Sequence, residues 1–167
     1  MSRVANALQV FTLCVAAAVC YGVLHDLVTA HVCVEYFTIG HPMLIPTGNP
    51  VLLALLWGIL ATWWVGAFLG FWLAVAATVS STPAARLVRP VQRLLVALGA
   101  AALLTGTGTM IAARMGLIWL VSPLADLVPG AAHTRFLFDG GAHLASYAAG
   151  FLGGLIVTVR TWRGKYR

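Results

Sequence analysis

Charged side chains are scarce in this sequence. Only 8% of its 167 residues are Asp, Glu, Lys or Arg, whereas a water-soluble domain usually has roughly a quarter of its residues charged. Hydrophobic residues make up 61% of the chain, and the mean hydropathy is +0.95. This composition excludes an ordinary soluble domain and indicates that a lipid bilayer is the solvent. Each crossing needs about 20 apolar residues, so four crossings with short connections occupy the whole length.

The sequence also lacks the short motifs of well-defined metal and redox sites. Cys14, Cys20 and Cys33 form no C-x-x-C pair, which argues against a zinc knuckle and a dithiol redox centre. No H-E-x-x-H spacing occurs either. The formal net charge of +6 does not indicate nucleic acid as a partner, because the basic residues flank hydrophobic segments.

Four long apolar segments predict an all-α fold, a four-helix transmembrane bundle that forms a single integral membrane domain over 1–167. We place the spans at about 4–24, 51–79, 91–121 and 138–159. Asn49 and Pro50 are typical of a helix N-terminus, so the second span has the clearest start.

Basic residues predict the orientation of the bundle. Lys and Arg gather on the cytoplasmic side of membrane proteins, and here they cluster in 84–93 and from Arg160 onward. Four crossings place both clusters and both termini in the cytoplasm, and the connections 25–49 and 122–137 on the outer side. An odd number of crossings would put one cluster on the wrong side.

All four acids and all five histidines then fall at the outer end of the molecule. The acids are Asp26, Glu35, Asp126 and Asp139, and the histidines are His25, His31, His41, His133 and His143. Ionisable groups near membrane depth are costly unless they face a partner or a water-filled cavity, which makes this collection the first candidate for a functional site.

The collection suits a divalent transition metal. Imidazole and carboxylate groups are the ligands that zinc, iron and manganese take, and a helix presents Asp139 and His143, four residues apart, on one face. The predicted metal ligands are His25, Glu35, His41, Asp139 and His143. We expect Asp26 to be a further ligand or the acceptor that orients one, and His31 and His133 to be solvated loop residues.

Hydrolysis is the chemistry that fits best if the protein is an enzyme. A bound metal would activate water, Glu35 or Asp26 would act as the catalytic base, and the substrate would come from the outer leaflet or the periplasm. The competing interpretation is a polar cap, in which these side chains only hydrogen-bond one another and Asp26 or Asp139 pairs with Arg114 or Arg135. A further alternative is a b-type haem held by His25 and His143.

Small residues form a stripe along the fourth span, with Ala142, Ser146, Gly150 and Gly154 at every fourth position. Such a stripe lets another helix approach closely. We favour packing inside the same bundle. The alternative is a non-catalytic accessory or assembly subunit, whose stripe docks to a homo-oligomer or a larger membrane complex.

The outer segment resembles a known sequence pattern. His25-Asp26 with Thr29, then Glu35-Tyr36-Phe37-Thr38 and His41-Pro42, are similar to a pattern in a family of small uncharacterised bacterial multi-pass inner-membrane proteins. Asp139, His143, Ser146 and Tyr147 fit the last span of the same family. The resemblance implies a bacterial inner membrane and no particular activity.

The conformation of the segment 26–49 is open. Polar and apolar residues alternate from Val28 to Glu35, which is typical of a strand, whereas His31 and Glu35 have the spacing of one helix face. A lone strand would lack a pairing partner. We therefore favour a short helix or coil on the outer surface.

Overall fold

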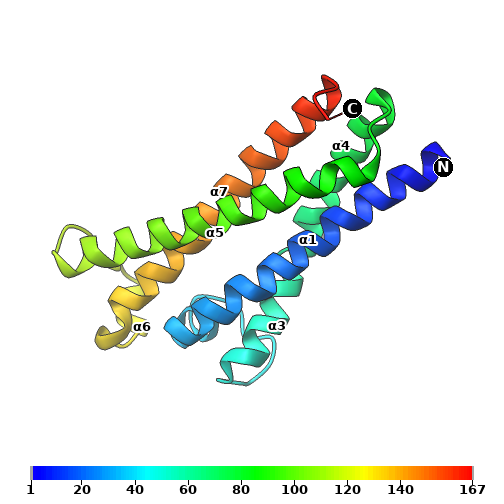
Figure 1. Cartoon of the computed structure of the whole chain (residues 1–167). Coiled ribbons are helices and arrows are strands. Elements are labelled where there is room, and N and C mark those ends of the chain that lie inside the picture. The colour runs from blue at the N-terminus through cyan, green and yellow to red at the C-terminus, as the bar shows by residue number, and fades with distance from the viewer. Residues whose placement is uncertain (1, 167) are drawn as a thin grey trace.

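The computed structural model describes residues 2–166, and over these residues the protein is helical with no strand. The α-helices are α1 (Arg3–Val32), α2 (Val34–Thr38), α3 (Pro50–Leu60), α4 (Trp63–Ser80), α5 (Ala84–Arg114), α6 (Leu124–Leu127) and α7 (His133–Trp162), and a short 3-10 turn, η1 (Gly130–Ala132), precedes α7. Four helical units, Arg3–Val32, Pro50–Ser80, Ala84–Arg114 and Gly130–Trp162, are long and apolar enough to cross a membrane. The predicted all-α four-helix bundle is confirmed (Figure 1).

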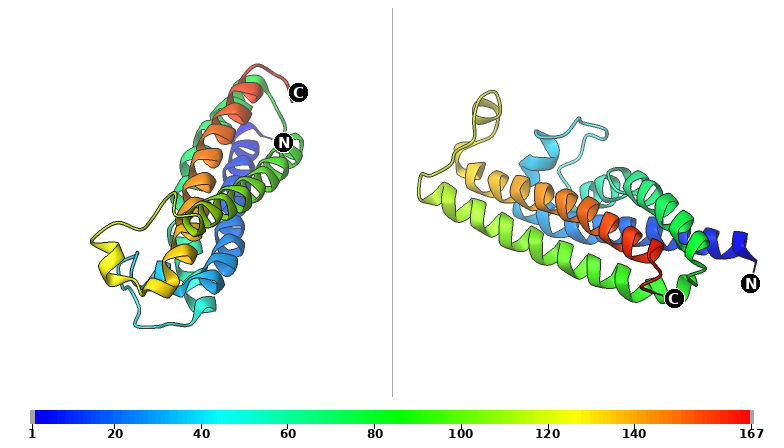
Figure 2. Two further views of the ribbon diagram at one scale, coloured as in Figure 1. Left: turned by 90° about the vertical axis from the view of Figure 1, so that its left-hand side faces the viewer. Right: turned by 90° about the horizontal axis from the view of Figure 1, so that it is seen from above.

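The bundle consists of two halves that follow the order of the chain. Helix α1 packs mainly on α3 and α4, and α5 packs mainly on α7. Both termini lie at one end of the bundle, next to the α4–α5 turn, which we call the terminal end (Figures 1 and 2). The opposite end carries α2 and α6 and is called the loop end. An even number of crossings requires this arrangement, and the assignment of the terminal end to the cytoplasm stays a prediction.

Helix α1 is longer than predicted. It continues eight residues beyond the expected end at 24 and stops at Val32. His25 and Asp26 therefore lie within the helix and not at its end. The bundle gives the Asp26 carboxylate a partner within the helix, since Asp26 faces His143 of α7. The next residues form the short helix α2, so the predicted helix in 26–49 is confirmed and the strand alternative is wrong.

Helix α5 is displaced by seven residues at both ends from the predicted 91–121. The basic segment 84–93 is helical because its apolar residues Leu87 and Val91 are buried while Arg86 and Arg89 stay exposed. The helix ends after Arg114 because Gly116 adopts a φ of +70°, and the N–H of Leu117 then donates to the carbonyl of Ala112 at 2.9 Å. Helix α7 exceeds the predicted 138–159 at both ends.

The second span is divided. The predicted 51–79 is present as α3 and α4, which are separated at Ala61 and Thr62. As predicted, Asn49 caps α3: its side-chain oxygen accepts hydrogen bonds from the N–H groups of Val51 and Leu52. At the break, the Thr62 hydroxyl donates to the carbonyl of Gly58.

Glycines bring α1 against this divided span. A Cβ atom on Gly58 would lie 2.6 Å from the Cα of Val23, and one on Gly66 would lie 2.8 Å from the carbonyl oxygen of Cys14. Real Cβ atoms do not approach so closely, so these contacts between backbones require glycine.

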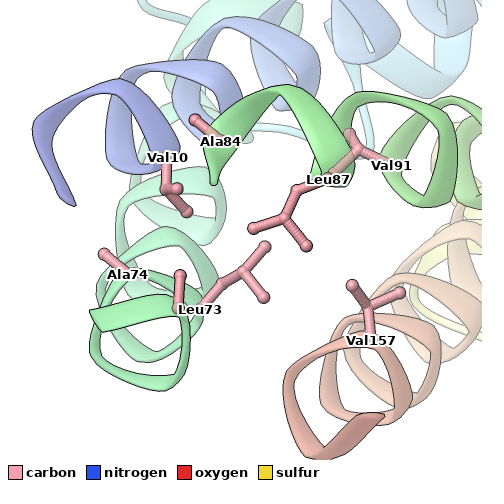
Figure 3. Packing of buried hydrophobic residues seen from close by; sticks show 8 residues of the cluster. Val10, Leu73, Ala74, Ala84, Leu87, Val91 and Val157 are labelled. Atoms are coloured by element: carbon pink, nitrogen blue, oxygen red, sulfur yellow. The ribbon is translucent and has the colours of Figure 1, made fainter. Parts of the chain in front are cut away.

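All four spans meet in one hydrophobic cluster near the terminal end (Figure 3). Val10 of α1, Leu73 of α4, Leu87 of α5 and Val157 of α7 are all buried there. This cluster closes the terminal end of the bundle and leaves the loop end to the polar residues.

The small-residue stripe of α7 faces helices of the same bundle. A Cβ on Gly154 would lie 2.8 Å from Leu69 of α4, and one on Gly150 would lie 3.6 Å from Leu98 of α5. Ala142 and Ser146 are buried as well. Packing within the bundle, the interpretation that we favoured, accounts for the stripe, and docking of another chain on it would require these contacts to break.

Asn6 joins the start of α1 to the α4–α5 turn. Its side-chain amide donates to the carbonyl of Thr82 at 3.0 Å and accepts from the N–H of Ala84 at 2.8 Å. We expect Asn6→Ala to lower the free energy of unfolding by about 1–3 kcal/mol, because two polar backbone groups lose their partner. Thermal unfolding of the detergent-purified variant measures this loss. Gln92→Ala, at an exposed position on α5, is the control and should behave as wild type.

Candidate metal centre

Three polar side chains from two spans converge near the loop end of the bundle. His25 and Asp26 come from α1 and His143 comes from α7. The Nε2 atom of His143 lies 3.3 Å from Oδ1 of Asp26, and the ring centroids of His25 and His143 are 4.6 Å apart. Each of the three residues offers one ligand atom, and these atoms all lie within 4.8 Å of one another. We call this group the His-Asp-His cluster.

The backbone of α7 fixes the tautomer of His143. Its Nδ1 lies 2.8 Å from the carbonyl oxygen of Asp139, and a carbonyl only accepts hydrogen bonds, so Nδ1 carries the hydrogen. In the neutral ring, Nε2 then has a lone pair, which faces the Asp26 carboxylate. Two electron-pair donors at 3.3 Å need a proton or a cation between them. A backbone carbonyl behind the far ring nitrogen is also the usual support of a metal-bound histidine.

His25 adds a third donor to the same place. Its Nε2 atom is buried and has no hydrogen-bond partner within residues 2–166. A buried polar atom without a partner is costly, so it marks a position where a ligand would be favourable. Tyr21 stacks on the His25 ring with centroids 5.6 Å apart, and its hydroxyl forms a hydrogen bond of 2.7 Å with that of Ser146.

The His-Asp-His cluster lies in the half of the spanning helices nearer the loop end. At a rise of about 1.5 Å per residue, His25 lies roughly 10 Å from the loop end of α1 and His143 roughly 15 Å from that of α7. Helices of this length exceed the roughly 30 Å hydrocarbon core by several ångströms on each side. With the helices centred in the membrane, the cluster lies roughly 3–8 Å inside the hydrocarbon boundary.

Aromatic rings enclose the cluster on the side of the loop end. Tyr36 of α2 lies against the ring of His143 with a centroid distance of 4.6 Å, and Phe37 of the same helix is buried. Burial raises the pKa of the Tyr36 phenol.

Two of the predicted ligands, His41 and Glu35, lie outside the His-Asp-His cluster, and only His41 lines the cavity beside it. The Nδ1 atom of His41 lies 2.9 Å from the carbonyl oxygen of Tyr36, and its ring is 6.4 Å from that of His143. The carboxylate of Glu35 accepts a hydrogen bond from the thiol of Cys33 at 3.3 Å. Burial raises the pKa of Cys33 to about 12, so the thiol keeps its proton and is a donor here.

The remaining predicted ligand, Asp139, lies behind His143. Its side chain is fully buried, and both carboxyl oxygens lack a hydrogen-bond partner in the described part of the chain. Its main chain orients His143, but its carboxyl group is not a member of the His-Asp-His cluster. The sequence did indicate that Asp139 and His143 share one helix face, and the contribution of the Asp139 carbonyl was not foreseen.

The other histidines bond to their own backbone. His31 is exposed and its Nδ1 lies 2.6 Å from the carbonyl oxygen of Leu27, while Nε2 of His133 lies 2.9 Å from that of Val128. His31 is the solvated residue that we expected, although it belongs to α1 and not to a loop. His133 is half-buried at the start of α7.

The geometry argues against one of the alternatives. A haem held by His25 and His143 would need the macrocycle between their rings, which instead touch edge to face at 4.6 Å and leave no room for it. The polar cap stays open, because the contact between Asp26 and His143 is the mutual hydrogen bonding that it predicts, although no arginine pairs with either acid in the described part of the chain. Within residues 2–166, Asp26 pairs with His143 and the carboxyl group of Asp139 has no hydrogen-bond partner.

A cavity that is not evident from the sequence continues from the cluster into the bundle. It has a volume of about 170 Å³, and His25, Asp26, His41 and His143 line its polar end. The only pattern that pointed to it was the small residues on α1, α4 and α7, because small side chains leave space where helices diverge.

Compared with protein-family models, curated proteins and solved structures, the chain matches none. Its function must therefore be argued from the side chains of the site, because a bundle of helices by itself does not define an activity.

Proposed function

We propose that the protein is a multi-pass membrane protein that binds a divalent transition metal, zinc, iron or manganese, through His25, Asp26 and His143. The observation that carries this proposal is the convergence of two imidazole nitrogens and one carboxylate, with ligand atoms within 4.8 Å of one another. Two of them, Nε2 of His143 and Oδ1 of Asp26, face each other as electron-pair donors, and the third has no partner.

Hydrolysis is the reaction that this ligand set supports best. Two histidines and one carboxylate are the protein ligands of well-known hydrolytic zinc sites, and three ligands leave a position for water. When bound, the metal would supply a hydroxide at neutral pH by lowering the pKa of a water molecule. The hydroxide oxygen would bond to the carbon or phosphorus of the substrate, the bond to the leaving oxygen would break, and the proton taken from the water would pass to that leaving oxygen.

The catalytic base in this proposal is Glu35. Asp26 was the other candidate, but as a metal ligand it is not available to take a proton. Glu35 is half-buried on α2, the helix whose Tyr36 ring lies against His143, and is not itself in the His-Asp-His cluster. Glu35→Gln is therefore expected to lower the activity while the metal content stays at the wild-type level.

The site would work at the outer face of a bacterial inner membrane. The basic residues favour a cytoplasmic terminal end, which places the loop end and the His-Asp-His cluster on the periplasmic side. The sequence pattern around His25 and His41 supports the same membrane. The substrate would then come from the outer leaflet or the periplasm.

Elemental analysis of the purified protein tests the proposal. The protein is expressed without a polyhistidine tag, purified in detergent and compared with His25→Ala, Asp26→Asn and His143→Ala variants. We expect one equivalent of zinc, iron or manganese in the wild type. The metal content of each variant should fall at least ten-fold, because three ligands hold a metal much more tightly than the two that remain.

Two histidines outside the cluster provide matched controls. His31→Ala and His133→Ala remove the same chemical group from positions that bond only to the backbone in the structure, so they should keep the metal. A wild-type protein that contains no metal, and takes up none after incubation with these ions, would contradict the proposal. A proton between Nε2 of His143 and Oδ1 of Asp26 would then account for their distance of 3.3 Å.

A further inference from the structure

The cavity extends from the His-Asp-His cluster along the helices toward the terminal end. Along α1 it reaches from Asp26 to Cys14, and along α7 from His143 to Thr158. At about 1.5 Å per residue these stretches are roughly 18 and 22 Å long. One leaflet contributes roughly 15 Å to the hydrocarbon core, so the cavity has the length of a single lipid chain.

The walls of the cavity are apolar below its polar end. Leu69, Leu73, Leu94 and Val157 line it toward the terminal end. The hydroxyls of Thr62 and Thr158 also belong to residues of the lining, but each donates to a carbonyl of its own helix. These threonines are satisfied without water, so the cavity gives water few partners.

Such a space is not expected to stay empty. Atoms that line an empty apolar cavity lose packing partners, and water enters a cavity only where it finds several polar groups. The solvent around this bundle is hydrocarbon. A lipid chain is therefore available to fill a long apolar space.

The cavity also reaches the surface that faces lipid. Tyr147 of α7 lines it and is 38% exposed, and Trp57 and Ala61 line it from the other side and are half-buried. The α3–α4 break lies at this position. Helix α4 packs on α7, whereas α3 packs chiefly on α1. Helices α3 and α7 therefore separate toward the loop end.

We propose that the cavity binds one hydrocarbon chain of a membrane lipid, which enters between α3 and α7 and whose head group lies at His25, Asp26 and His143. The binding of the chain follows from the cavity alone. The further step, that this lipid is the molecule on which the site acts, rests on the proposed metal-dependent hydrolysis and deepens it by naming the substrate class. The cluster, roughly 3–8 Å below head-group depth, gives the polar end of such a lipid a hydrogen-bonding partner, or a cationic one when a metal is bound.

Photocrosslinking in lipid vesicles tests the binding of the chain. The full-length protein is reconstituted in phosphatidylethanolamine vesicles that contain a phosphatidylethanolamine with a diazirine near the end of one acyl chain, and labelled residues are mapped by mass spectrometry. We expect labelling of the deep lining residues Leu69, Leu94 and Val157. Ala61→Phe, which fills the lateral opening, should reduce this labelling at least five-fold, whereas Ala148→Phe, at an exposed position of α7, should not.

The outcomes separate this proposal from that of the metal. Labelling confined to lipid-facing residues such as Leu103 and Leu152, in the folded wild type, would overturn the lipid proposal whatever the variants do. Deep labelling that is the same in Ala61→Phe and wild type would overturn the entry route between α3 and α7. His143→Ala should lose the metal and keep the deep labelling. A failure of metal binding therefore leaves the lipid result intact, and an absence of deep labelling leaves the metal result intact.

Discussion

Replacing Gly58 by leucine is expected to abolish most of the folded protein. A Cβ atom at this position would lie 2.6 Å from both the N and the Cα of Val23, and backbone atoms within a helix cannot move aside as a side-chain tip can. Helix α3 would have to separate from α1, and the wall of the cavity and the aromatic contacts of His41 with Trp57 would be lost with it. We expect little monodisperse protein after detergent extraction, and thermal unfolding of the remainder at least about 10 °C lower.

Gly99→Leu is the matched control for this prediction. It places the same side chain in the middle of a spanning helix, but a Cβ on Gly99 meets nothing within 4 Å. This variant should be extracted and should unfold like the wild type. If Gly58→Leu and Gly99→Leu behave alike, the close packing of α1 on α3 is not what holds the bundle together.

Added zinc should raise the thermal stability of the wild-type protein by a large amount. A ligand that binds only the folded state at 100 times its Kd adds about 2.7 kcal/mol to the free energy of unfolding. For a chain of this size that corresponds to a rise of roughly 5–10 °C in Tm. The His-Asp-His cluster joins α1 to α7, two helices that otherwise make few contacts, so a metal there would connect the two halves of the bundle.

The cluster variants and a chelator make this measurement specific. His25→Ala and His143→Ala should unfold at the same temperature with and without zinc, and EDTA should return the wild type to its metal-free Tm. His31→Ala should retain the full zinc effect, because His31 points away from the cluster and bonds to Leu27. An equal rise in Tm in wild type and His143→Ala would indicate zinc binding elsewhere on the surface and would contradict the assignment of the cluster.

The number and nature of the spans could be predicted from the sequence, and their ends could be predicted only in part. Asn49 and Pro50 marked the start of α3 correctly because a capping side chain acts locally. The end of α5 was missed although Gly116 lies just beyond it, since the hydrophobic residues continue to Val121 and hydrophobicity dominated the prediction. The extension of α1 past Asp26 depends on His143, a residue more than a hundred positions away, and no local signal contains that contact.

The residues of the site could also be predicted only in part. The collection of acids and histidines at one end identified His25 and His143 because both belong to long helices whose direction the topology fixes. The positions of Glu35 and His41 depend on the short helix α2 and on the path of the chain after it, and these follow from packing against Phe136 and Trp57 that the sequence does not display. The same holds for the cavity, which is a property of how two pairs of helices diverge.

The division of the bundle into α1–α4 and α5–α7 has a consequence for its biogenesis. Helix α1 finds its main contacts in α3 and α4, which follow it in synthesis, and Asn6 binds the turn that ends this half. The first half can therefore close before the second has left the ribosome. The site cannot, because His25 and Asp26 belong to the first half and His143 to the second. A metal ion bound there would be a signature of completed assembly, present only in molecules whose two halves have docked in the membrane.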